Sequence, residues 1–132
     1  MANEFALQTQ DRELLLLQAQ DALSMHQVWV ARGRAHINGQ SMNLPADFVK
    51  NEDLCPIGAW LRERLDPKLR EIPLYERSNL AHVNFHIALD ALFAQPPGHT
   101  RAEHRDSFNQ TDRDLTTILQ EWVALGLPPQ RG

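Results

Sequence analysis

The chain has 132 residues, of which 42% are hydrophobic and 23% charged, with a formal net charge of -4 and a pI near 5.8. This size and composition are typical of one globular domain with its own core, so residues 1–132 are predicted to form a single domain. The acidic balance argues against nucleic acid and anionic membranes as main partners, because both attract clustered Lys and Arg.

Membrane insertion and secretion are not expected either. The longest run of apolar residues, Leu14 to Leu17, is far too short to span a bilayer. The first residues lack the basic and apolar regions of a secretory signal. The single cysteine, Cys55, cannot form an intramolecular disulfide, so the reducing cytoplasm is the expected location.

The segment from Thr9 to His36 is predicted to be one long helix. Apolar or small residues recur there at steps of three and four, which is typical of a buried helix face, and His26 occupies one position of the same stripe. The other members of the stripe are Leu15, Ala19, Ala22, Trp29 and Gly33. A loop rich in Asn, Asp, Gly and Pro follows over residues 38–53.

Three further helices are predicted. A short one runs from Pro56 to about Leu65, with proline at the first helical position, where its missing N–H group costs nothing. The next runs from Pro73 to about Ala94, and its inward stripe is Ser78, His82, His86, Leu89 and Phe93. The last helix ends near Gly126, and its stripe is Phe108, Thr111, Leu115, Ile118, Trp122 and Leu125.

Residues 100–103, Thr-Arg-Ala-Glu, have the form of a capping box at the start of the last helix. The charged residues after this point are predicted to form a solvated face: Arg101, Glu103, Arg105, Asp106, Asp112, Arg113 and Asp114. Since no segment alternates with a period of two, the predicted fold is all-α. It is a small antiparallel bundle of the four-helix type, built from three long helices, with an additional short helix that carries Cys55.

The histidines of the bundle are the candidate functional residues. His82 and His86 are four residues apart, so their side chains lie about one turn apart on one helix face. Such a pair is weak on its own, and a buried histidine with one hydrogen bond is common. However, His26, His82 and His86 all lie on stripes that should face the core, where each would need its own partner. One metal ion bound also by Cys55 would satisfy all of them.

Thiolate and imidazole donors favour Zn²⁺ over Mg²⁺ or Ca²⁺, which prefer oxygen ligands. The predicted zinc ligands are His26, Cys55, His82 and His86. Four protein donors leave no position for an activated water, so hydrolytic chemistry is not expected and the protein is predicted not to be an enzyme. Cys55 directly precedes Pro56 and should therefore lie at the start of the short helix. The remaining histidines, His36, His99 and His104, are predicted to be at the surface.

Three fragments carry a resemblance to a known family. They are His26-x-x-Trp29, then, after twenty-five residues, Cys55-x-Ile57-Gly58-x-Trp60, and, after twenty-one more, His82-x-x-x-His86. This pattern resembles the chemoreceptor zinc-binding (CZB) domain family, over the central part of the chain. The resemblance implies a small helical bundle with one zinc bound by three His and one Cys.

The resemblance also implies a function. Domains of this family are regulatory and control soluble chemoreceptors or diguanylate cyclases, which make cyclic-di-GMP. They sense zinc, and in some members the cysteine is a redox switch toward oxidants such as hypochlorous acid. A homodimer and a bacterial signalling protein as output partner are therefore expected. This chain contains neither a GG[DE]EF cyclase motif nor a long signalling coil, so it is either a stand-alone version or an excised domain.

Four other residues are predicted to surround the metal. Trp29, Gly58 and Trp60 belong to the matching fragments, and Trp60 is expected to shield the metal from water. Asp21 is the acidic residue nearest upstream of His26, in the position of a family residue linked to tuning of the site. Asp21 is five residues before His26, so its side chain points away from the helix face that carries His26. A role at the surface is at least as compatible with this spacing.

Two other classes of function remain open. A di-metal or metal-dependent enzyme built on a helical bundle would need inward carboxylates or an open coordination position. A metal-free interaction bundle would need none of these donors. Elemental analysis distinguishes a metal-free bundle from a zinc-binding domain, visible absorption distinguishes an iron protein, and an open coordination position would support a metal-dependent enzyme.

Overall fold

The computed structural model describes residues 7–40 and 55–128. The predicted all-α fold is confirmed, and the described ranges contain no β-strand. Its long helices are α1 (Thr9–Ile37), α4 (Pro73–Phe93) and α5 (Ala102–Gly126). Of the predicted loop over residues 38–53, residues 41–53 lie outside the described residues. No helix in the described ranges combines the length and hydropathy needed to cross a bilayer.

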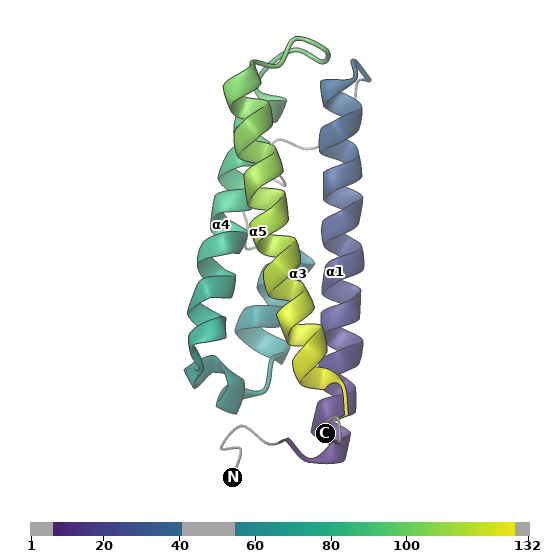
Figure 1. The fold of residues 1–132 in the computed structure, drawn as a ribbon, viewed down its shortest axis with the longest axis vertical. Helices are drawn as coiled ribbons and strands as arrows, with labels where there is room; N and C mark the ends of the chain where they lie inside the picture. Colours follow the sequence, from purple (N-terminus) through teal and green to yellow (C-terminus); the bar gives the residue numbers. More distant parts are fainter. Residues whose placement is uncertain (1–6, 41–54, 129–132) are drawn as a thin grey trace.

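The three long helices form the bundle. In Figure 1, α1 and α4 run in the same direction and α5 runs antiparallel to both. The short helix α3 (Pro56–Ala59) lies in one half of the bundle and contacts both α1 and α4. It continues into a π-helical turn, η2 (Trp60–Arg64), and a 3₁₀ turn, η3 (Pro67–Glu71), leads to α4.

Proline fixes the start of α3, η3 and α4. Pro56, Pro67 and Pro73 each occupy the first turn of a helix, where no N–H group is needed. The predicted short helix therefore begins where expected. Its second half differs: the N–H of Leu65 donates to the carbonyl of Trp60 at 2.8 Å, five residues back, which is the π-helical pattern.

The predicted inward stripe of α1 is confirmed, and α1 packs closely on α5 at two glycines. All its predicted members are buried, including His26. Gly33 faces the ring of Phe108, and Gly126 faces the backbone of Leu16, where a Cβ would lie 2.6 Å from the Cα. Both contacts need a residue without a side chain. Close packing along the α1–α5 seam places the middle of α5 directly against His26.

Several expectations at the helix ends are wrong. His36 is buried rather than exposed: its Nε2 donates to the carbonyl of Gln95 at 2.6 Å and its ring packs on the edge of Phe93. No capping box forms at Thr100, because α5 begins at Ala102 and the Glu103 carboxylate accepts from the side chain of Arg101. Leu125 is 36% exposed, since the helix ends one residue later.

Candidate metal centre

Cys55 lies at the start of α3, as its place before Pro56 predicted. It is the N-cap residue, with an extended backbone, and only 1% of its surface is exposed. Burial raises the pKa of the Cys55 thiol above its ordinary value of 9.0. The backbone N–H groups of Ile57 and Gly58 and the charge of Arg62 oppose this and lower the pKa. The thiol is therefore protonated at neutral pH unless a cation stabilises the thiolate.

His82 and His86 lie one turn apart on the inward face of α4. Both are 3% exposed, and their ring centroids are 4.6 Å apart, edge to face. Burial lowers the pKa of His82 to about 3, with smaller contributions from charge on His86, Arg62 and His26. Nε2 of His82 is buried and has no hydrogen-bond partner among the residues that the structure describes. His82 is therefore neutral at physiological pH, with one ring nitrogen unused.

The fold brings these three side chains to one point. Each offers one ligand atom, from Cys55, His82 and His86, and all three atoms lie within 4.8 Å of one another in a fully buried location. Metal–nitrogen and metal–sulfur bonds of about 2.0–2.3 Å place the donors of one ion at comparable separations. A buried Cys/His/His group within ligand distance is thus a feature of this structure, and it joins α4 to the start of α3.

His26, the fourth predicted ligand, is adjacent but does not belong to this group. It is completely buried on α1, and its ring meets the edge of Phe85 at 4.6 Å. Nε2 donates to Oδ1 of Asp112 at 2.8 Å, whereas Nδ1 has no hydrogen-bond partner within the described ranges. Burial lowers the pKa of His26, Asp112 raises it, and charge on His86 lowers it. The assignment of His26 as a ligand stays a prediction.

The four residues predicted around the metal occupy different environments. Trp29, Gly58 and Trp60 are buried, and the indole N–H of Trp60 donates to Oε1 of Gln18 at 3.0 Å. The rings of Trp60 and Trp122 also pack edge to face, with their centroids 5.9 Å apart. Asp21 is exposed on α1, in keeping with a surface role.

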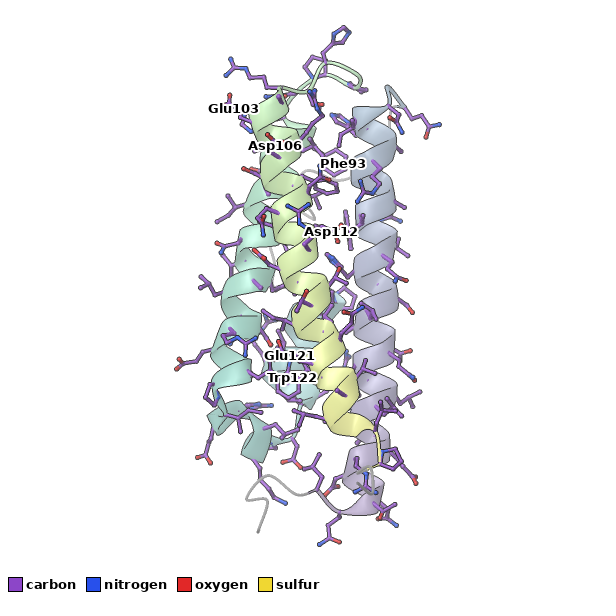
Figure 2. The ribbon with its side chains drawn as sticks, viewed as in Figure 1. Phe93, Glu103, Asp106, Asp112, Glu121 and Trp122 are labelled. Carbon is purple, nitrogen blue, oxygen red and sulfur yellow. The ribbon has the colours of Figure 1, made fainter. Side chains whose placement is uncertain are left out.

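Asp112 was wrongly assigned to the solvated face. Its side chain is only 15% exposed, and it lies near the middle of α5 on the side that meets α1 (Figure 2). A signal was present in the sequence: Asp112 is four residues after Phe108 and three before Leu115, so it lies on the buried stripe of α5. A carboxylate on such a stripe needs a buried partner, and that partner is His26.

The donor set suits a soft divalent cation better than a hard one. A thiol and imidazoles are ligands of Zn²⁺ and related ions, whereas Mg²⁺ and Ca²⁺ require oxygen. Two buried ring nitrogens, Nδ1 of His26 and Nε2 of His82, have no hydrogen-bond partner in the part of the chain that the structure describes. Because unpaired buried polar atoms are costly, both observations fit a metal held here.

Comparison with known proteins gives no match to a family model, a curated protein or a solved structure. The sequence pattern and the geometry around Cys55 are therefore the features that indicate a function.

Proposed function

We propose that this protein is a zinc-binding regulatory domain whose metal is held by four side chains: His26, Cys55, His82 and His86. The observation that carries the proposal is the meeting of one thiol and two imidazoles, from separate elements, at a buried point. The resemblance to the CZB family adds support, because its pattern contains the same residues in the same order.

The protein residues in this proposal act as points of attachment. Cys55 fixes the start of α3, His82 and His86 fix the middle of α4, and His26 fixes α1. Bound zinc with four protein donors supplies a cross-link rather than an activated water, so a regulatory role is favoured over catalysis. Cys55 must lose its proton to bind, which couples zinc affinity to pH.

Cys55 is also the residue through which an oxidant would act. In the net reaction with hypochlorous acid, the thiolate is oxidised to sulfenic acid and chloride is released. A sulfenic acid is a poorer donor than a thiolate, so oxidation weakens the hold of Cys55 on the metal. Release of Cys55 frees the start of α3, a local change that can alter the surface of the bundle.

The proposal extends to the oligomeric state of the domain and to the protein that it regulates. The resemblance favours a homodimer that regulates a bacterial chemoreceptor or a diguanylate cyclase, in the same chain or as a partner. Light scattering of the zinc-loaded protein measures the first of these expectations: a dimer mass supports it, and a monomer mass at micromolar concentration contradicts it.

Zinc content per chain tests the proposed site. The purified protein is loaded with zinc, desalted and analysed by elemental mass spectrometry, and we expect about one zinc per chain. His82→Ala and Cys55→Ala should lose most of it, whereas His99→Ala, at an exposed histidine, should keep it. A folded wild-type protein that retains no zinc contradicts the proposal. So does an unchanged zinc content in both core variants. Visible absorption would instead indicate iron and the alternative class of bundle enzyme.

A further inference from the structure

We infer that Asp112 is a positioning residue of the metal centre, which holds Nε2–H of His26 and thereby presents Nδ1 of that ring as the metal-binding atom. This inference rests on the proposed function and adds a residue that is absent from the sequence pattern behind it. Four observations carry it: the contacts of Asp112, the state of the His26 ring, the surroundings of that ring, and the place of α5 in the bundle.

Asp112 is held in place from both sides. Its Oδ1 accepts hydrogen bonds from Nε2 of His26 at 2.8 Å and from Oγ1 of Thr116 at 3.1 Å. Its Oδ2 accepts from Nη2 of Arg34 at 3.2 Å. The carboxylate is thus fixed between a buried imidazole and a half-exposed guanidinium. A freely rotating surface aspartate would not be held by three donors.

The bond to Asp112 determines which nitrogen of His26 is free. An ionised carboxylate can only accept hydrogen bonds, so Nε2 carries the hydrogen. A metal-binding imidazole is neutral and has a single N–H group, which leaves the lone pair on Nδ1. Nδ1 is the buried atom that lacks a hydrogen-bond partner among residues 7–40 and 55–128. Metal-binding histidines commonly donate their second nitrogen to a carboxylate in this way.

The ring of His26 also lies beside the Cys/His/His group. Phe85 contacts the His26 ring at 4.6 Å between centroids and the His86 ring at 6.3 Å. Charge on His26 lowers the pKa of His82, and charge on His86 lowers that of His26, so the three rings share one buried environment.

This arrangement connects α5 to a metal centre to which it contributes no ligand. α1 and α5 share the longest seam of the bundle, and Asp112 joins them at the level of His26 (Figure 2). Metal binding that restrains His26 therefore also restrains Asp112 and, through Oδ2, Arg34. In this inference α5 responds to metal occupancy through a single carboxylate.

The alternative is that Asp112 forms a buried ion pair of purely structural importance. Removal of Asp112 would then lower the stability of metal-free and metal-loaded protein equally and leave the metal dissociation constant unchanged. A positioning residue instead changes the dissociation constant itself. The identity of the nitrogen bound to the metal is a second readout that a structural ion pair would not determine.

The test combines affinity and spectroscopy on the full chain. Dissociation constants for Co²⁺ and Zn²⁺ are measured by competition with a chromophoric chelator for wild type, Asp112→Ala and Asp112→Asn. We expect Asp112→Ala to bind about 10–100-fold more weakly. Asp112→Asn should fall between the two, because it keeps an oxygen acceptor without the charge. The matched control is Asp114→Ala, at an exposed aspartate on the same helix that accepts a hydrogen bond from Gln110, and its affinity should equal that of wild type.

NMR of ¹¹³Cd-loaded, ¹⁵N-histidine-labelled wild type identifies the bound nitrogen without any substitution. We expect a ¹¹³Cd coupling at Nδ1 of His26, with the hydrogen on Nε2. Coupling at Nε2, no coupling at His26, or an unchanged affinity in Asp112→Ala would overturn the inference. If metal still binds through Cys55, His82 and His86, the proposed site survives in these cases. A wild-type protein that binds no metal overturns the proposed function instead, and the inference with it.

Discussion

At the scale of single residues, burial keeps the groups around Cys55 neutral. It raises the pKa of Cys55 and lowers those of His26 and His82, so each of the three resists the charged form. In the metal-free protein at neutral pH, Cys55 is consequently a thiol and the imidazoles of His26 and His82 are neutral. Binding of a divalent cation must displace the thiol proton, which means that metal affinity decreases as the pH is lowered.

The low pKa of His82 predicts how the stability of the metal-free protein depends on pH. Above pH 6.5 the ring is neutral in both folded and unfolded chains, and its contribution to stability is complete. Between pH 6.5 and about 3 the unfolded chain binds a proton that the folded chain excludes, so the free energy of unfolding falls. At pH 5.5 this loss is on the order of 1 kcal/mol from His82 alone.

Urea unfolding in the presence of chelator, at pH 7.5 and pH 5.5, measures this effect. His82→Asn cannot titrate, so its stability should fall less than that of wild type over this interval, by on the order of 1 kcal/mol. His99→Asn, at an exposed position, should behave like wild type. Parallel pH profiles for wild type and His82→Asn would show that His82 is not neutral in the folded chain.

Local sequence patterns predicted some of these residues and could not predict others. The stripe of α4 placed His82 and His86 in the core, and Pro56 placed Cys55 at a helix start, so the position of each residue was accessible from local rules. The spacing of Asp112 from Phe108 and Leu115 indicates its burial, but its partner His26 is 86 residues away and no local pattern identifies it. Pairings at such separations depend on helix packing, which single-helix periodicity does not specify.

At the scale of elements, the α1–α5 seam depends on glycine. A Cβ on Gly126 would lie 2.6 Å from both the backbone nitrogen and the Cα of Leu16, and backbone atoms cannot move aside as a flexible side chain can. Gly126→Ala is therefore expected to lower the free energy of unfolding by about 1–3 kcal/mol. Helix propensity alone would act in the opposite direction, because alanine is the better helix former.

The matched control for Gly126→Ala is Ala124→Gly, at an exposed position two residues earlier on α5. Helix propensity alone predicts that Gly126→Ala stabilises the protein and that Ala124→Gly destabilises it. If the Cβ at position 126 collides with Leu16, both variants are less stable than wild type. Thermal or chemical unfolding of both variants distinguishes these cases. A stabilised Gly126→Ala protein would mean that the seam can widen at little cost.

Helix positions were more predictable than helix details. Apolar periodicity and proline located α1, α4 and the start of α3 closely. The π-helical turn at Trp60 was not predicted, because its residues fit an α-helix equally well and tertiary packing selects the wider turn. The expected capping box at Thr100 failed because the Glu103 carboxylate pairs with Arg101 instead. Competing side-chain partners of this kind are not visible in a motif.

At the scale of the whole molecule, the candidate metal centre joins the start of α3 to the inward face of α4. Cys55 is the N-cap residue of α3, His82 and His86 belong to α4, and the hydrogen bond between His26 and Asp112 joins α1 to α5 beside them. The far end of the bundle is held differently, by the hydrogen bond from His36 to Gln95 and by its contact with Phe93 (Figure 2). Loss of metal should therefore loosen one region of the bundle and spare the other.

Hydrogen exchange with and without chelator tests this division. α3 is short and makes few contacts with the rest of the fold, so its attachment depends strongly on Cys55. We expect exchange over residues 56–64 to increase after metal removal and exchange near residues 36 and 93–98 to change little.

At a metal concentration 100 times the dissociation constant, binding raises the free energy of unfolding by about 2.7 kcal/mol. Chelation should therefore lower Tm by about 10 °C. Cys55→Ser should show the looser pattern even with metal present, because a hydroxyl is a much poorer zinc donor than a thiolate. Uniform exchange across the bundle, or an increase confined to the end at His36, would place the metal-dependent contact away from α3.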